Sequence, residues 1–310
     1  MPHPQIPNFL QTLILAIIQG AAEMLPISSS AHVTIAARLM GCRGTDNQWA
    51  FLLIMLHTGT MLAVLVYFRS RWKSLWKQWP ALAVATLATG VVGYGLNELL
   101  KRCFLRAAPG TPPQEVEHLF YQLPLIAAAL AMVGIVIIAA GLKDQKNPGR
   151  REQIGYWPAT VIGMVQGLAL PFRGFSRSGS TISTSLFFGI ERIRAEEFSF
   201  ALAVILTPVL IVYEGRHLIG HGAASSDPST GISPLILPSL AGMCFSFVAG
   251  LVALRWLSRW LERGRWQWFG GYCLIAAAIV LAIHFGMPEK APQSAQRELT
   301  RVESSVYNGR

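Results

Sequence analysis

Charged residues are scarce in this sequence. Asp, Glu, Lys and Arg make up only 14% of the 310 residues, whereas hydrophobic residues make up 52%. Soluble domains carry roughly a quarter charged residues, so this chain has too few charges to cover a water-facing surface. The composition argues against a disordered chain and, despite a net charge of +10, against a soluble protein that binds nucleic acid. We expect an integral membrane protein in a lipid bilayer, with no nucleic-acid partner.

Cysteine is also scarce. The four cysteines, Cys42, Cys103, Cys244 and Cys273, are far apart and form no C-x-x-C pair. Neither a zinc site nor a redox motif is indicated, and we expect no structural disulfide. The first eight residues contain no Lys or Arg, and the apolar run that follows ends in Gln-Gly. We therefore expect no removable signal peptide.

Long apolar runs, by contrast, are abundant. A bilayer core about 30 Å thick needs about 20 apolar residues per helix. Six stretches fit this length and predict transmembrane helices, although the fourth is short unless its helix continues to about residue 219. They lie near residues 49–68, 80–100, 121–142, 198–213, 234–254 and 268–287.

Two other regions, residues 9–40 and 154–190, are apolar but interrupted by glutamine, proline and clustered serines. Each half is about 10 to 15 residues long, which is too short to span a bilayer. Irregular backbone at membrane depth is tolerated only where it is buried in protein or lines a wet cavity. We therefore predict two re-entrant helical hairpins that enclose a cavity.

The two interrupted regions resemble each other, because each has a Gln-Gly pair, a Leu-Pro pair and a serine cluster in the same order. Each is followed by three predicted spans, so a second copy must be inverted in the membrane. We predict an all-α polytopic membrane protein with an inverted-topology repeat, six transmembrane helices and two re-entrant hairpins. The first repeat covers residues 1–153, the second, inverted repeat covers 154–287, and 288–310 form a polar tail that we expect to be disordered.

Positive charges give an orientation to this arrangement. The predicted inner connections (69–77, 143–151, 192–194 and 255–265) hold 14 Lys and Arg residues, and the outer loops hold 4. Lys and Arg are enriched in cytoplasmic loops. Both termini should therefore face outward, with the first hairpin open to the outside.

Glu23 is the clearest functional candidate, because an ionisable residue inside a membrane segment is costly to keep. Gln19 lies one helical turn earlier on the same face. A carboxylate and an amide oxygen suit a hard cation such as Mg²⁺ or Ca²⁺, so Glu23 and Gln19 form a candidate metal site. The alternative is a polar pair that only joins helices.

A serine cluster follows this pair. Pro26 should end the first half-helix, and Ser28, Ser29 and Ser30 are suited to cap the next one. The N-terminus of such a helix favours anions. Ser29 and His32 are spaced i, i+3, which suits a nucleophile beside a proton-transfer group. The alternative is a set of capping serines with an incidental histidine.

The second hairpin offers a matching turn at residues 174–181. Arg177 is flanked by the hydroxyls of Ser176 and Ser178, and its planar guanidinium suits phosphate oxygens. Two helix N-termini, an arginine and a divalent cation would together form a diphosphate pocket. Arg173 is a second candidate contact.

Two further polar residues lie in apolar segments. Gln166 occupies in the second repeat the place that Gln19 has in the first, so we expect it to contact substrate. His57 lies within a predicted span, either in the wall of the cavity or as a hydrogen-bonded structural residue.

These motifs resemble those of a known family. They are Gln19-x-x-x-Glu23, the Leu-Pro-Ile-Ser-Ser-Ser-Ala-His segment at 25–32, Gly-Phe-Ser-Arg-Ser-Gly at 174–179 and Glu-Phe-Ser-Phe at 197–200. In this order they are similar to the undecaprenyl pyrophosphate phosphatases of bacterial inner membranes, also called bacitracin-resistance proteins. The resemblance runs from about residue 9 to about residue 285.

The resemblance implies an enzyme that removes one phosphate from undecaprenyl diphosphate and recycles the lipid carrier of peptidoglycan synthesis. It also implies a pocket open to the periplasm, a divalent cation, Mg or Ca, and a polyprenyl diphosphate as the lipid partner. Matched by position, Glu23, Ser29, His32 and Arg177 are the expected catalytic residues. A homodimer is one assembly that we consider.

A transporter is the alternative from another class. The same inverted repeat would suit a flippase for polyprenyl phosphate, or an anion transporter. A transporter needs an anion-binding arginine but no nucleophile beside a proton-transfer group, so the chemistry distinguishes the two.

Overall fold

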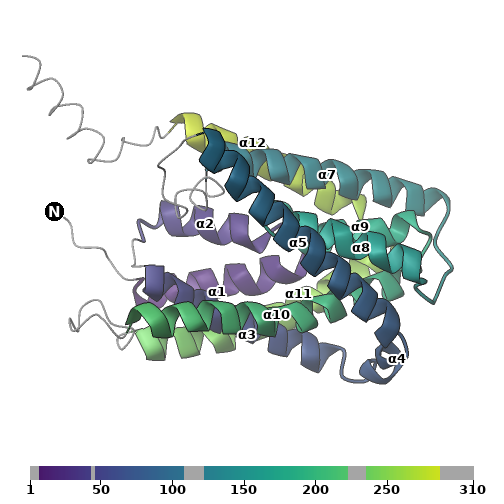
Figure 1. Ribbon diagram of the computed structural model, residues 1–310, viewed down its shortest axis with the longest axis horizontal. Helices are drawn as coiled ribbons and strands as arrows, with labels where there is room; N and C mark the ends of the chain where they lie inside the picture. Colours follow the sequence, from purple (N-terminus) through teal and green to yellow (C-terminus); the bar gives the residue numbers. More distant parts are fainter. Residues whose placement is uncertain (1–6, 43–45, 108–121, 223–234, 287–310) are drawn as a thin grey trace, which may run out of the picture.

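The computed structural model describes residues 7–42, 46–107, 122–222 and 235–286 (Figure 1). In these residues the fold is all-helical, apart from one isolated β-bridge between Arg151 and Ile190. The described helices are α1 (Phe9–Met24), α2 (Ser29–Leu39), α3 (Asp46–Tyr67), α4 (Trp72–Trp76), α5 (Trp79–Ala107), α7 (Leu123–Lys146), α8 (Tyr156–Ala169), α9 (Arg177–Phe187), α10 (Arg192–Gly222), α11 (Ile236–Glu262) and α12 (Gln267–Gly286).

Six of these helices, α3, α5, α7, α10, α11 and α12, are long and apolar enough to cross a membrane. They coincide with the six predicted stretches. The fourth stretch begins earlier than predicted, because the apolar part of α10 covers Arg192–Val212 and the helix continues to Gly222. Large apolar side chains such as Leu87, Val91 and Ile275 are more than 60% exposed on these helices, as expected of a surface that faces lipid. The predicted polar tail, 288–310, lies outside the described residues.

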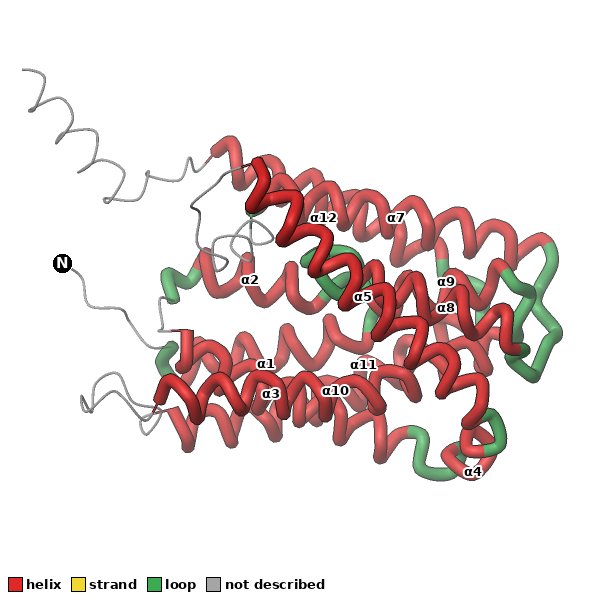
Figure 2. Tube along the Cα trace, in the orientation of Figure 1, coloured by secondary structure: helices red, strands yellow, loops and turns green. Residues whose placement is uncertain are grey.

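Four shorter helices form two pairs. Helices α1 and α2 lie together in one half of the molecule, and α8 and α9 lie together in the other half (Figure 2). Each pair is joined by a turn that contains a proline, Pro26 or Pro171, and proline ends a helix because it removes an N–H donor. The two turns meet in the interior, where Sγ of Cys273 and Oγ of Ser178 both bond to backbone carbonyls of the first turn.

Each short pair packs against a long helix from the other half of the chain. Helix α1 packs on α11, and α8 packs on α5. Glycines allow the close approach: a Cβ at Gly20 would lie 2.5 Å from the carbonyl oxygen of Ser246, and one at Gly163 would lie 2.1 Å from that of Ala85. Small residues commonly let helix backbones approach in membranes. The long helices therefore fix the positions of both interior turns.

Candidate active site

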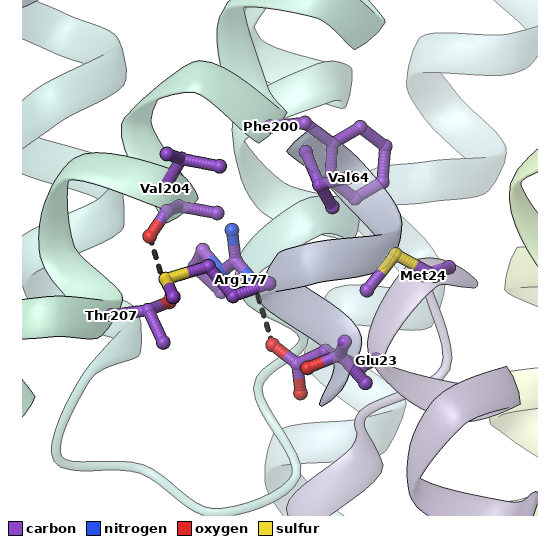
Figure 3. A pocket seen from close by; sticks show the side chains of 10 residues that line it. Glu23, Met24, Val64, Arg177, Phe200, Val204 and Thr207 are labelled. Carbon is purple, nitrogen blue, oxygen red and sulfur yellow. Dashed lines mark hydrogen bonds and ion pairs between the residues drawn. The ribbon is translucent and has the colours of Figure 1, made fainter. Parts of the chain in front are cut away.

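The candidate active site is centred on an ion pair between the two turns. Glu23 is at the end of α1 and Arg177 is at the start of α9, 154 residues later in the chain. Nη2 of Arg177 lies 2.7 Å from Oε1 of Glu23, and the side chains are only 19% and 16% exposed. Figure 3 shows them pointing toward each other across a small cavity. The two charged residues that the sequence singled out thus lie in contact.

Three more polar groups surround the second oxygen of Glu23. Oγ of Ser29 donates to Oε2 at 2.5 Å, Nε2 of Gln19 donates to it at 3.1 Å, and Nε2 of His57 lies 3.9 Å away. Gln19 is almost completely buried. The carboxylate is therefore shared among an arginine, a hydroxyl and an amide, and His57 belongs to the same cluster.

The serine turn departs from the predicted capping. Ser28 is the N-cap of α2 by position, but its side chain makes no capping hydrogen bond and its Oγ lies 3.2 Å from Oγ of Ser30. Its φ of 68° is the only positive value for a non-glycine residue within the described ranges. Such a conformation costs of order 1–3 kcal/mol and persists only where the surroundings enforce it. In this turn, Ser29 is the serine that faces Glu23.

His32 does not face Ser29 as the i, i+3 spacing had suggested. Its Nδ1 lies 2.8 Å from the carbonyl oxygen of Ser28, and its Nε2 lies 2.8 Å from the hydroxyl of Tyr272 on α12. No hydrogen bond between Ser29 and His32 occurs in the described part of the chain. The spacing places both residues in the first turn of α2, but the packing of α12 directs the imidazole toward Tyr272. No sequence motif points to Tyr272.

The second serine cluster mainly positions Arg177. Oγ of Ser176 accepts from the backbone N–H of Gly179 at 3.2 Å, so Ser176 is the N-cap of α9. Oγ of Ser178 donates to the carbonyl oxygen of Leu25 at 3.4 Å and so joins the two turns. Nη1 of Arg177 is buried and has no hydrogen-bond partner among the described residues. One N–H edge of the guanidinium therefore has no acceptor among the described residues.

Gln166 and Arg173 were the two remaining candidates of the second repeat. Gln166 on α8 is buried, and its Nε2 donates to Oγ1 of Thr89 on α5 at 3.1 Å. Although it repeats the position of Gln19, α8 turns it toward α5 and not toward Glu23. Arg173 is partly buried in the second turn, and its predicted contact with substrate stays a prediction.

The cavity beside the ion pair is also lined by side chains of two spanning helices, α3 and α10. Its lining includes Thr60, Met61 and Val64 from α3. It also includes Phe200 and Thr207 from α10 (Figure 3). Of these, Thr60 could have been noted beside His57, and Phe200 belongs to the 197–200 motif, whereas Met61, Val64 and Thr207 resemble any other residue of a spanning helix.

The other members of the 197–200 motif join helices. Glu197 is 2% exposed and receives hydrogen bonds from Arg71 and Arg194, each at 3.0 Å. Oγ of Ser199 lies 2.6 Å from Oγ1 of Thr181 on α9. These bonds fix α10 against α9 and against the segment that follows α3, so the motif supports the site from outside the ion pair.

The described residues contain no group of three or more His, Cys, Asp or Glu side chains placed to hold a metal ion. Glu23 and Gln19 provide one carboxylate and one amide, and the amide now turns its nitrogen toward the carboxylate. A cation here would need most of its ligands from a bound molecule.

The fold and the site together define a class: a multi-pass helical membrane protein with an ion-paired glutamate, a serine and an arginine gathered in its interior. The model of one family, described as bacitracin resistance protein BacA, matches residues 12–279. The chain belongs to this family, as its motifs had suggested.

Curated relatives are similar over most of their length. A protein of Acinetobacter baylyi named undecaprenyl-diphosphatase 2 is 50% identical over 286 residues, covering 89% of this chain and 98% of the relative. Proteins named undecaprenyl-diphosphatase from Desulfosudis oleivorans and Rhodopirellula baltica are 33% and 32% identical, covering 88% and 89% of this chain and 98% of each relative.

Proposed function

We propose that this protein is a membrane phosphatase that hydrolyses undecaprenyl diphosphate to undecaprenyl phosphate and inorganic phosphate. The observation that carries the proposal is the contact of Ser29 and Arg177 with the same buried carboxylate, Glu23. The names of the relatives identify the substrate. Hydrolysis would return the lipid carrier to peptidoglycan synthesis.

Arg177 is the group that would hold the diphosphate. Its unpartnered Nη1 can donate to a phosphate oxygen while Nη2 keeps its bond to Glu23. The N-terminal turns of α2 and α9 lie at the two interior turns, and their free N–H groups favour an anion. Charge-assisted bonds of this kind stabilise the charge that develops on the phosphoryl oxygens in the transition state.

The geometry favours Ser29 as the nucleophile and Glu23 as its base. Oγ of Ser29 already donates its proton toward Oε2 of Glu23 at 2.5 Å. As Oγ bonds to the terminal phosphorus, its proton would pass to Glu23, and the bond from that phosphorus to the bridging oxygen would break, releasing undecaprenyl phosphate. Water would then hydrolyse the phosphoserine. The sequence left His32 and Glu23 as the two candidates to take this proton, and the contact with Ser29 favours Glu23.

A divalent cation, Mg²⁺ or Ca²⁺, fits this site only as a partner of the substrate. Mg²⁺ commonly binds through one or two carboxylates together with substrate phosphates and water, and Glu23 with the amide oxygen of Gln19, after rotation of that amide, would supply the protein ligands. When bound, the ion would neutralise phosphate charge.

The packing supports an inverted repeat of residues 1–153 and 154–287. Its contacts are reciprocal: α1 packs on α11 as α8 packs on α5, while α3 meets α10 and α7 meets α12. These are the pairs that a twofold axis relating the two halves would produce. The short pairs α1–α2 and α8–α9 would then be re-entrant hairpins that meet near the bilayer midplane.

The loop charges support a pocket on the periplasmic side of the bacterial inner membrane. Lys and Arg are concentrated at the end where α4 lies, which the positive-inside tendency assigns to the cytoplasm. A homodimer stays a prediction.

The test is release of inorganic phosphate from undecaprenyl diphosphate by the purified protein in detergent. We expect turnover by the natural chain and a sharp loss in Glu23→Ala and Arg177→Ala. A matched control is Arg102→Ala, because Arg102 pairs with Glu98 on the exposed part of α5. Full activity of the Glu23 and Arg177 variants would overturn the site. A natural chain that releases no phosphate but moves the lipid across vesicles would support the transporter.

A further inference from the structure

Tyr272 is a residue that neither the motifs nor the ion pair accounts for. It lies on α12, and its hydroxyl is 2.8 Å from Nε2 of His32. The two rings are also stacked, with centroids 5.7 Å apart and planes inclined by 18°. A histidine in the first turn of α2 is thus held from both its edge and its face by one side chain, 240 residues away in the sequence.

The contacts of His32 determine which of its nitrogens carries the proton. A backbone carbonyl can only accept, so Nδ1, 2.8 Å from the carbonyl oxygen of Ser28, must be the N–H donor. In the neutral ring Nε2 then has the free electron pair, and the hydroxyl of Tyr272 donates to it. The carbonyl that selects this tautomer belongs to Ser28, the residue with positive φ, so the turn conformation and the state of the ring are linked.

We propose that Tyr272 is a positioning residue for the phosphatase reaction, which orients His32 and keeps Nε2 as its basic nitrogen. The inference rests on the proposed function. His32 bonds to the backbone carbonyl of Ser28, and the adjacent residue, Ser29, contacts Glu23. The tyrosine hydroxyl can donate to neutral Nε2 and can also accept from a protonated ring, so it orients the imidazole in either protonation state.

Tyr272→Phe removes the hydroxyl and leaves the stacked ring. We expect kcat to fall about tenfold, the loss that corresponds to one hydrogen bond of about 1.4 kcal/mol, with KM little changed because the phosphate-binding groups remain. The matched control is Tyr94→Phe, since Tyr94 is 76% exposed on α5, and it should keep the natural kcat. Comparable thermal midpoints would show that both variants fold.

A double-mutant cycle separates positioning from a general structural effect. In a His32→Ala background, measured at enzyme concentrations raised to resolve slow turnover, Tyr272→Phe should have no further effect. An equal loss of kcat in both backgrounds, or a natural kcat in the single variant, would overturn the inference. In either case a natural chain that releases phosphate would leave the proposed function standing, whereas an inactive natural chain would refute the function itself.

A spectroscopic measurement does not depend on turnover. With ¹⁵N-labelled histidine, and His32→Ala to assign the signal, neutral His32 should give a protonated Nδ1 and an unprotonated Nε2. Tyr272→Phe should move the Nε2 resonance, and Tyr94→Phe should not. A protonated Nε2 in the neutral ring, or an Nε2 signal that ignores Tyr272→Phe, would contradict the inference.

Discussion

Removing one partner of the central ion pair should destabilise the protein far more than removing both. In Arg177→Met, Glu23 would remain 16% exposed with hydrogen bonds from Ser29 and Gln19 but without the guanidinium. Breaking a buried pair in this way costs about 3–5 kcal/mol. At about 2–4 °C per kcal/mol for a chain of this size class, the unfolding midpoint in detergent should fall by at least about 6 °C.

The double variant Arg177→Met/Glu23→Gln removes both charges and keeps an amide that Ser29 can still donate to. Because no uncompensated charge is then buried, most of the lost stability should return. Phosphate release should stay abolished in both variants, because both lack the Arg177 guanidinium that binds phosphate. The assay is thermal unfolding monitored by size-exclusion chromatography, together with phosphate release. A single variant as stable as the natural chain, or a double variant no more stable than the single, would refute the buried contact.

Three other predictions test separate parts of the structure. Ser29→Ala should lower kcat by at least about a hundredfold, because it removes the group that donates to Glu23, while lipid binding persists; natural turnover would exclude Ser29 as the nucleophile. Gly163→Ala should destabilise the fold by about 1–3 kcal/mol through overpacking against Ala85. Its control is Gly90→Ala, which has nothing within 4 Å of the new Cβ and should be neutral or stabilising by up to about 1 kcal/mol. Equal thermal unfolding midpoints for the two variants would contradict the α5–α8 packing. A chelator should abolish phosphate release and added Mg²⁺ or Ca²⁺ should restore it; undiminished release would remove the cation from the mechanism.

The helices of the fold could be predicted from local sequence. Apolar runs of about 20 residues can be read locally, because every backbone polar group in a bilayer must be satisfied within its own helix. The six spanning helices were therefore predicted at nearly their observed positions. The short helices were also predictable, since Pro26 and Pro171 interrupt segments that are otherwise apolar. Glu23 and Arg177 stood out because charge at membrane depth is rare.

The pairing of the polar side chains, in contrast, depends on how the helices pack together. The i, i+3 spacing predicted a Ser29–His32 pair. In the structure, His32 instead forms a hydrogen bond with Tyr272 on α12, and Ser29 forms one with Glu23 at the end of α1. The repeat predicted a substrate contact for Gln166, yet its amide nitrogen donates to Thr89 on α5. The helical period determines which residues of one helix share a face, and it can be read from the local sequence. The residues that this face contacts depend on how separate helices pack, which local sequence does not determine.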